Sequence, residues 1–287
     1  MRASTFTLLT ALFLAACQSA GPGPSSSAPS LAYAEARAVS DPRYAGIVMD
    51  VETGEVLYSE NADSRRHPAS LAKLMTLYLL FEELEAGRLS RREAIPVSRN
   101  AARQPPSKLG LKAGTTISVD DAVKAIAIRS ANDVAVAVAE AIAGSEESFA
   151  RRMTAKAREL GLRATVFTNA SGLPDPGMVT TAREIAVLAR AVKARFPSEA
   201  RVFASKTFSF DGKRHESTNR LLGKVAGMDG MKTGYTRASG YNLAASVNRR
   251  GRRLIIVVMG EKSGAARDGH VAALAAEYLP GGLFASR

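Results

Sequence analysis

The stretch that decides how the chain folds is residues 70–86, Ser-Leu-Ala-Lys-Leu-Met-Thr-Leu-Tyr-Leu-Leu-Phe-Glu-Glu-Leu-Glu-Ala. The pattern predicts a helix that ends at Gly87. This helix is apolar nearly all round, which is typical of a helix buried in a core. Lys73 is the only charged residue between Ser70 and Phe81. Because burial disfavours the charged ammonium, we expect a lowered pKa, which makes Lys73 a candidate general base.

Ser70 precedes Lys73 by three residues, so the two side chains share one helix face. The predicted helix N-terminus at Ser70 favours developing negative charge and offers backbone N–H groups to an oxyanion. The same spacing also fits a plain N-cap serine followed by a snorkelling lysine. The pair alone therefore leaves open both a nucleophile with its base and a simple helix start.

The flanking sequence predicts an α/β protein of the α+β kind. An apolar hairpin is expected over 45–50 and 56–60, and residues 254–259 read as a central strand buried on both faces. Further strands are expected at 202–210, 228–235 and 240–247, and residues 98–116 are mostly loop. Helices are expected at 119–128, 133–143, 146–160, 181–193 and 267–278. The order favours an antiparallel sheet from the N-terminal hairpin and the C-terminal strands, flanked by helices and an inserted helical lobe.

The composition excludes several classes of protein. The 287 residues are 46% hydrophobic and 23% charged, unlike a wholly disordered, collagen-like or polytopic membrane chain. The net charge of +12 favours an anionic partner. With one Cys and three His, we expect no disulfide within the chain and no metal site.

The N-terminus predicts export. Residues 1–16 carry one basic residue and then a short apolar run, as in a secretory signal. Residues 14–17, Leu-Ala-Ala-Cys, resemble the lipobox of a bacterial lipoprotein, which implies a lipid on Cys17; an ordinary cleaved signal is the alternative. We expect residues 17–41 to be a lipid-anchored flexible linker and residues 42–287 to be the folded domain. This predicts a protein anchored to a membrane of the cell envelope on the periplasmic side, with the outer membrane as one option, and no nucleic-acid partner.

Two further motifs with polar residues lie next to or within predicted helices and strands. Residues 130–132, Ser-Ala-Asn, lie between two predicted helices, where a helix cap is the simpler interpretation. Residues 232–234, Lys-Thr-Gly, lie in a strand-like segment. Glycine within a strand often marks a close approach by a ligand backbone, and Lys232 offers a cation to a carboxylate.

The three motifs occur in the order recorded for penicillin-binding proteins and class A β-lactamases. Over nearly all of residues 42–280 the chain resembles a serine-type D-alanyl-D-alanine carboxypeptidase, a low-molecular-weight penicillin-binding protein. Residues 67–76, 169–181 and 230–236 are similar to blocks of that family. The resemblance implies a β-lactamase/DD-peptidase-like fold and no cofactor.

The resemblance also implies roles for individual residues. Ser70 would be the nucleophile, Lys73 its base and Ser130 a proton relay. The residues that hold the peptide, its backbone and its terminal carboxylate would be Asn132, Lys232, Thr233 and Gly234. The implied substrate is the peptidoglycan stem pentapeptide, which loses its terminal D-alanine through an acyl-enzyme. β-Lactam antibiotics would acylate the same serine.

Three alternatives remain at this point. A D,D-endopeptidase uses the same residues on peptidoglycan cross-links. A class A β-lactamase needs a glutamate in an E-x-x-L-N loop, which this sequence lacks, and usually has aspartate where Ala131 stands. A non-catalytic peptidoglycan-binding lipoprotein would have no need of a buried lysine beside a serine. Because the chain ends soon after residue 278, we also expect no C-terminal β-domain and no amphipathic anchoring helix.

Overall fold

The computed structural model describes residue 1 and residues 43–279. The predicted signal after Met1, the predicted lipid attachment at Cys17 and the predicted linker up to residue 41 therefore lie outside the described residues. Within the described residues, no helix combines the length and the apolar character that a membrane span requires.

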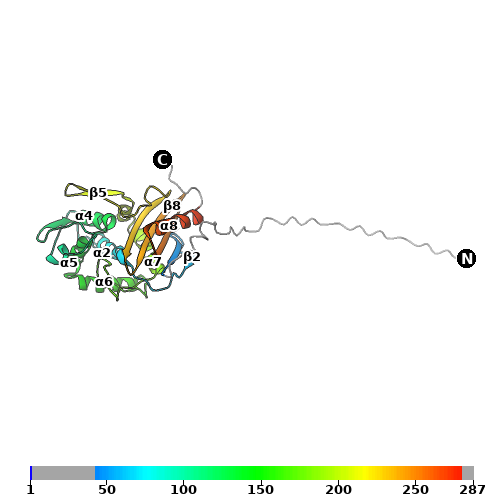
Figure 1. Ribbon diagram of the computed structural model, residues 1–287, viewed down its shortest axis with the longest axis horizontal. Coiled ribbons are helices and arrows are strands. Elements are labelled where there is room, and N and C mark those ends of the chain that lie inside the picture. The colour runs from blue at the N-terminus through cyan, green and yellow to red at the C-terminus, as the bar shows by residue number, and fades with distance from the viewer. Residues whose placement is uncertain (2–42, 280–287) are drawn as a thin grey trace.

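A five-stranded antiparallel sheet forms one side of the molecule (Figure 1). Its strand order is β2-β1-β9-β8-β7, so strands from both ends of the chain pair, as predicted. The strands are β1 (Ala45–Asp50), β2 (Val56–Glu60), β7 (Met228–Thr236), β8 (Gly240–Arg249) and β9 (Arg252–Glu261). The apolar run 254–259 is fully buried in β9, which confirms the predicted central strand.

The sheet has a hydrophobic core on each face because successive side chains of a strand point to opposite sides. On β9, Ile255 and Val257 join the larger core, together with α7 (Ala182–Arg195) and α2 (Lys73–Glu85). Ile256 and Val258 join the second core, which α8 (Gly264–Tyr278) covers. Because β9 is buried on both faces, its central residues do not alternate between apolar and polar side chains.

A helical lobe is inserted between β2 and β7 (Figure 1). The buried helix α2 passes between the lobe and the sheet and packs against α5, α6 and α7. A 3-10 turn, η1 (Ala69–Ala72), precedes α2, and the short helix α3 (Arg99–Ala102) lies in the predicted loop. The other lobe helices are α4 (Val119–Lys124), the π-helical η2 (Ala125–Arg129), α5 (Asn132–Ala143) and α6 (Glu146–Glu159).

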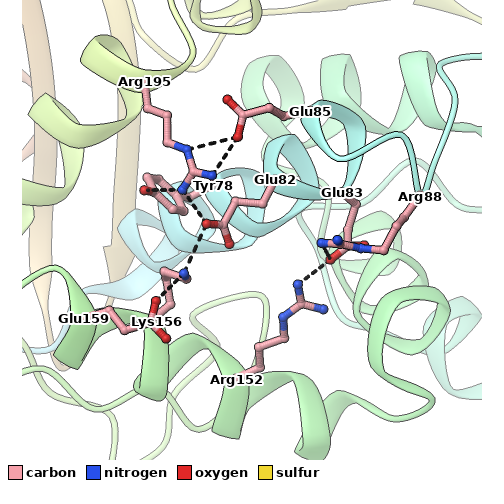
Figure 2. Close-up of polar contacts among 9 residues, drawn as sticks. All are labelled: Tyr78, Glu82, Glu83, Glu85, Arg88, Arg152, Lys156, Glu159 and Arg195. Atoms are coloured by element: carbon pink, nitrogen blue, oxygen red, sulfur yellow. Dashed lines mark hydrogen bonds and ion pairs between the residues drawn. The ribbon is translucent and has the colours of Figure 1, made fainter.

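Two buried glutamates near the end of α2, Glu82 and Glu83, tie it to its neighbours (Figure 2). Glu82 accepts from Arg195 of α7 at 2.5 Å and from Lys156 of α6 at 3.1 Å. Glu83 is 6% exposed and pairs with Arg88 and with Arg152 of α6. The network fixes α2 against α6 and α7, and α2 is the helix that begins at Lys73.

The predicted strand over 202–210 is wrong in its first half and correct over its last four residues. Residues Glu199–Ala204 form a 3-10 helix, η3, and only Thr207–Phe210 are extended, as β5. β5 pairs with β6 (Lys213–Glu216) in a separate small sheet. The reason is tertiary: Phe203 is buried against β7, where a Cβ on Gly230 would lie 2.7 Å from the Phe203 Cβ.

Two other differences are local. The helix predicted over 119–128 changes from α to π geometry at Ala125, so its last turn is wider. A second small sheet, β3 (Ala94–Pro96) with β4 (Thr116–Ser118), was not predicted, because three-residue strands carry too short a pattern.

Candidate active site

Ser70 and Lys73 lie on consecutive turns at the start of α2. Lys73 is fully buried, and its Nζ lies 3.0 Å from Ser70 Oγ. Ser70 belongs to the 3-10 turn η1, whose first residue, Ala69, has a left-handed backbone (φ 48°). The structure therefore brings together the pair that the spacing predicted to share a face.

Two other oxygens surround the Lys73 ammonium. Nζ is 2.7 Å from Asn132 Oδ1 and also contacts the Ser171 carbonyl oxygen. The Asn132 amide is oriented by its Nδ2, which donates to the Pro105 carbonyl at 2.8 Å. This bond leaves Oδ1 facing the lysine, so both additional partners of Nζ act as hydrogen-bond acceptors.

Burial lowers the pKa of Lys73 well below its usual value, and the nearby Lys232 lowers it further. Asp133 and Glu146 oppose this shift through their negative charge. A neutral amine has two N–H donors and one lone pair. Since Asn132 Oδ1 and the Ser171 carbonyl can only accept, the two N–H groups satisfy them and the lone pair is left for the Ser70 hydroxyl. The arrangement can therefore remove a proton from Ser70.

Ser130 ends the π-helix η2 in a left-handed conformation (φ 63°, ψ 35°). A residue other than glycine rarely adopts this geometry, and such strain is concentrated at functional sites. Ser130 is 6% exposed and lines the same cleft as Ser70. The predicted turn between two helices is thus confirmed, and it places Ser130 in the lining of the cleft.

The Lys232–Gly234 segment lies in β7, the edge strand of the large sheet. Lys232 is fully buried, its Nζ donates to the Thr233 carbonyl at 3.0 Å, and burial together with Arg267 lowers its pKa to about 7. A Cβ on Gly234 would lie 3.0 Å from the Pro68 carbonyl oxygen and 3.2 Å from Ser70 N. Glycine therefore lets β7 approach the turn that carries Ser70.

A cleft of about 740 Å³ joins these elements. Its lining contains five of the predicted site residues: Ser70, Ser130, Asn132, Thr233 and Gly234. Lys73 and Lys232 lie beneath the surface, with their amines behind the cleft wall. The cleft also contains cationic and polar side chains that sequence reasoning did not single out: Arg129, Glu216, Thr218, Arg220 and Arg267. Cys17, the eighth predicted site residue, lies outside the described residues.

Sequence reasoning also missed two side chains that hold the walls of the site, the buried Asp133 and the half-buried Asn169. Asp133 is fully buried and accepts backbone N–H groups of residues 109, 110 and 111, at 2.8–3.1 Å. Asn169 Oδ1 accepts N–H groups of residues 171, 172 and 173, which places the Ser171 carbonyl at Lys73. In the sequence, Asp133 is an ordinary acidic residue in the first turn of a helix, and Asn169 is a loop residue within a block similar to the family. Neither position by itself indicated a role in holding the site.

The comparisons with known proteins agree with this geometry. A family model described as D-alanyl-D-alanine carboxypeptidase matches residues 35–263. The D-alanyl-D-alanine carboxypeptidase DacC of Escherichia coli is 40% identical over 226 residues, 76% of this chain and 56% of DacC. DacF of Bacillus subtilis is 36% identical over 78% of this chain and 59% of DacF. The chain thus spans somewhat over half the length of these curated relatives.

Solved structures extend the likeness to the fold. Penicillin-binding protein 5 of Haemophilus influenzae superposes with a TM-score of 0.78 at 33% identity, covering 81% of this chain and 69% of that one. Penicillin-binding protein D2 of Listeria monocytogenes, in a cefotaxime-bound form, gives 0.73 at 34% identity, covering 80% and 94%. The predicted fold class and family resemblance are confirmed. This chain belongs to the D-alanyl-D-alanine carboxypeptidase family.

Proposed function

We propose that the protein is a serine D,D-carboxypeptidase that removes the terminal D-alanine from peptidoglycan stem pentapeptides. The observation that carries this proposal is the buried Lys73 Nζ, 3.0 Å from Ser70 Oγ, with its other two partners being acceptors. The family membership supports the same activity.

In the first step, Lys73 accepts the Ser70 proton while Oγ attacks the carbonyl between the two D-alanines. The resulting oxyanion lies beside the Ser70 N–H at the start of the helix. The C–N bond then breaks, the acyl group stays on Ser70, and the leaving amine takes a proton from the Ser130 hydroxyl. Lys73 returns its proton to Ser130, so no net proton is lost in acylation.

In the second step, water replaces the leaving D-alanine. Lys73 takes a proton from the water, and the hydroxide attacks the ester carbonyl. The ester C–O bond breaks, Ser70 recovers its proton, and the shortened peptide leaves with a new carboxylate. The chemistry uses only side chains of this chain.

Recognition of the free C-terminus follows from the cationic end of the cleft. Lys232 and Arg267 lie near enough for Arg267 to lower the pKa of Lys232, so two positive groups share this region. Thr233 Oγ1 donates to Thr218 Oγ1 at 2.8 Å, which places two hydroxyls beside them. Arg267 pairs with Asp268 at 2.6 Å, whereas Lys232 donates only to a backbone carbonyl, so a substrate carboxylate bound beside Lys232 raises the pKa of this lysine. This favours a carboxypeptidase over an endopeptidase.

We further propose that β-lactams acylate Ser70, because one protein with the same fold, penicillin-binding protein D2 of Listeria monocytogenes, was solved in an ampicillin-bound and a cefotaxime-bound form. The proposed location is the periplasmic side of the cell envelope. A lipid on Cys17 would anchor the chain to a membrane, the outer membrane where the cell has one. The linker over 17–41 would then hold the catalytic domain away from the lipid surface.

The test is intact-mass measurement of the domain from residue 40 onward, incubated with benzylpenicillin, followed by peptide mapping and a D-alanine release assay on a pentapeptide. We expect an adduct on Ser70 and release of one D-alanine per peptide. Rapid drug consumption without an adduct would indicate a β-lactamase instead. An untouched drug and an uncut peptide would favour a non-catalytic binding protein.

A further inference from the structure

A second pocket opens beside the catalytic cleft. Its volume is about 230 Å³, and it shares Gly172, Leu173 and Thr236 with the cleft. We call it the loop pocket, because the loop over 172–178 forms most of its wall; the turn at 67–69 and the residues Thr236 and Ala238 form the rest. Pockets for whole ligands measure about 300–1,000 Å³, so the loop pocket has room for a single side chain.

The loop pocket is held rigidly on both sides. Asn169 Oδ1 fixes the start of the loop through three backbone N–H groups. His67 Nδ1 lies 2.8 Å from the Met178 carbonyl oxygen and ties the loop to the turn before Ser70. Gly172 packs so closely on that turn that a Cβ there would lie 1.9 Å from the Ala69 carbonyl oxygen. The walls are therefore formed before any ligand arrives.

The lining is mostly apolar, and its polar side chains are those of His67, Asp175 and Thr236. Leu173, Pro174 and Pro176 supply apolar wall, and Asp175 supplies the only carboxylate in the lining as far as the described residues define it. Asp175 Oδ1 accepts the Gly177 N–H at 2.7 Å, which fixes the direction of the side chain and leaves Oδ2 to meet a ligand. Such a pocket complements an aliphatic side chain that ends in a positive charge.

The direction of the bound peptide places one particular residue at the loop pocket. In the proposed function the substrate carboxylate binds at Lys232 and Thr233, and the scissile carbonyl binds at Ser70, whose backbone N is beside Gly234. A peptide on the free edge of β7 therefore runs antiparallel to it, with earlier residues toward Thr236. At about 3.3 Å per residue, the residue before the two D-alanines lies next to Thr236, at the mouth of the pocket.

We infer that the loop pocket binds the side chain of the residue that precedes D-alanyl-D-alanine, and that Asp175 selects an aliphatic side chain ending in an ammonium group. This inference rests on the proposed function. It assigns the pocket to the third residue of the stem peptide and makes Asp175 a specificity-determining residue rather than a catalytic one.

The experiment compares two pentapeptides that differ only at the third residue, one with lysine and one with norleucine, which has nearly the same stem without the ammonium. We expect the wild-type protein to show about fivefold higher kcat/KM for the lysine peptide, the ratio that a half-buried ion pair supports. Asp175→Asn keeps the acceptor for the Gly177 N–H, so the loop is expected to fold. In this variant the ratio between the two peptides falls to about one.

Glu55→Gln is the matched control, because Glu55 is an exposed acid in the β1–β2 turn and its loss changes the net charge equally. This variant should keep the fivefold ratio. A wild-type ratio near one, or a fivefold ratio retained by Asp175→Asn, would overturn the inference while D-alanine release and penicillin acylation still support the proposed function. If neither peptide is cut and penicillin leaves Ser70 unmodified, the proposed function fails and the role of the pocket falls with it.

Discussion

Replacing Lys232 with methionine should make the protein more stable while it removes binding of the substrate carboxylate. Burial lowers the pKa of Lys232 from 10.5 to about 7. At ~1.4 kcal/mol for each tenfold change, holding this ammonium charged inside the protein costs about 5 kcal/mol as an upper limit. Methionine has a similar length and carries no charge. It gives up the bond to the Thr233 carbonyl, which is worth about 1 kcal/mol, so we expect a net gain of about 2–4 kcal/mol below pH 7.

The sign of the pH dependence follows from the direction of the shift. Between about pH 7 and pH 10.5, Lys232 is protonated in the unfolded chain and neutral in the folded protein. The unfolded state then binds more protons, so the free energy of unfolding of the wild-type protein rises with pH across this range. Methionine has no such dependence. Its advantage should therefore be largest at pH 6 and should nearly disappear by pH 10.

Thermal unfolding of both proteins between pH 6 and pH 10 measures this difference. A gain of about 2–4 kcal/mol corresponds to a Tm higher by about 5–15 °C for a domain of this size. Lys112→Met is the control, because Lys112 is exposed and its replacement should change Tm little at any pH. An equal or lower Tm for Lys232→Met at pH 6, or a gain that is the same at pH 6 and pH 10, would refute the reasoning.

Three further predictions concern the nucleophile, its base and the ion pairs behind them. Ser70→Ala should fold with an unchanged Tm and take up no penicillin; an adduct on the folded variant would exclude Ser70 as the nucleophile. The rate of acylation at a fixed concentration of penicillin should rise with pH through the lowered pKa of Lys73, because only the neutral amine accepts a proton. Lys73→Met should abolish acylation. A rate that is constant from pH 5 to pH 9 would contradict the role of Lys73 as a base. Glu83→Gln should cost about 2 kcal/mol at pH 7, because it breaks the pairs with Arg88 and Arg152. These pairs lower the pKa of Glu83, so the difference between variant and wild type in the free energy of unfolding should shrink as the pH falls through that lowered pKa. Urea unfolding measures this difference, and a value that stays constant with pH would argue against the pairs.

The sequence predicted the structure correctly where the residues of a single helix or strand determine whether that element is buried. The apolar helix after Ser70 had to be buried, and burial of that helix had to bury Lys73 and lower its pKa. The continuous apolar run of β9 had to lie between two layers. The three motifs at their positions indicated the family, which the comparisons confirm.

The sequence failed where a distant partner decided the local structure. Residues 202–210 alternate in a way that suits a strand, but Phe203 packs against β7 and the first half becomes a 3-10 helix. The wider π turn that leaves Ser130 in a left-handed conformation has no local signal either. Asp133 looks like a first-turn acid until residues 109–111 are seen to donate to it.

The sequence by itself determined that Ser70 and Lys73 would lie on one face, that the helix carrying them would be buried, and that Lys232 would lie in a strand. Only the tertiary structure decided that Asn132 and the Ser171 carbonyl accept from Lys73, that β7 passes close enough to Ser70 for glycine to be required, and that the loop pocket opens beside the cleft. The physical reason is the distance along the chain over which each effect acts. Periodicity, capping and desolvation act within one segment, whereas the direction of a lone pair depends on acceptors that lie about 60 and 100 residues away in the chain.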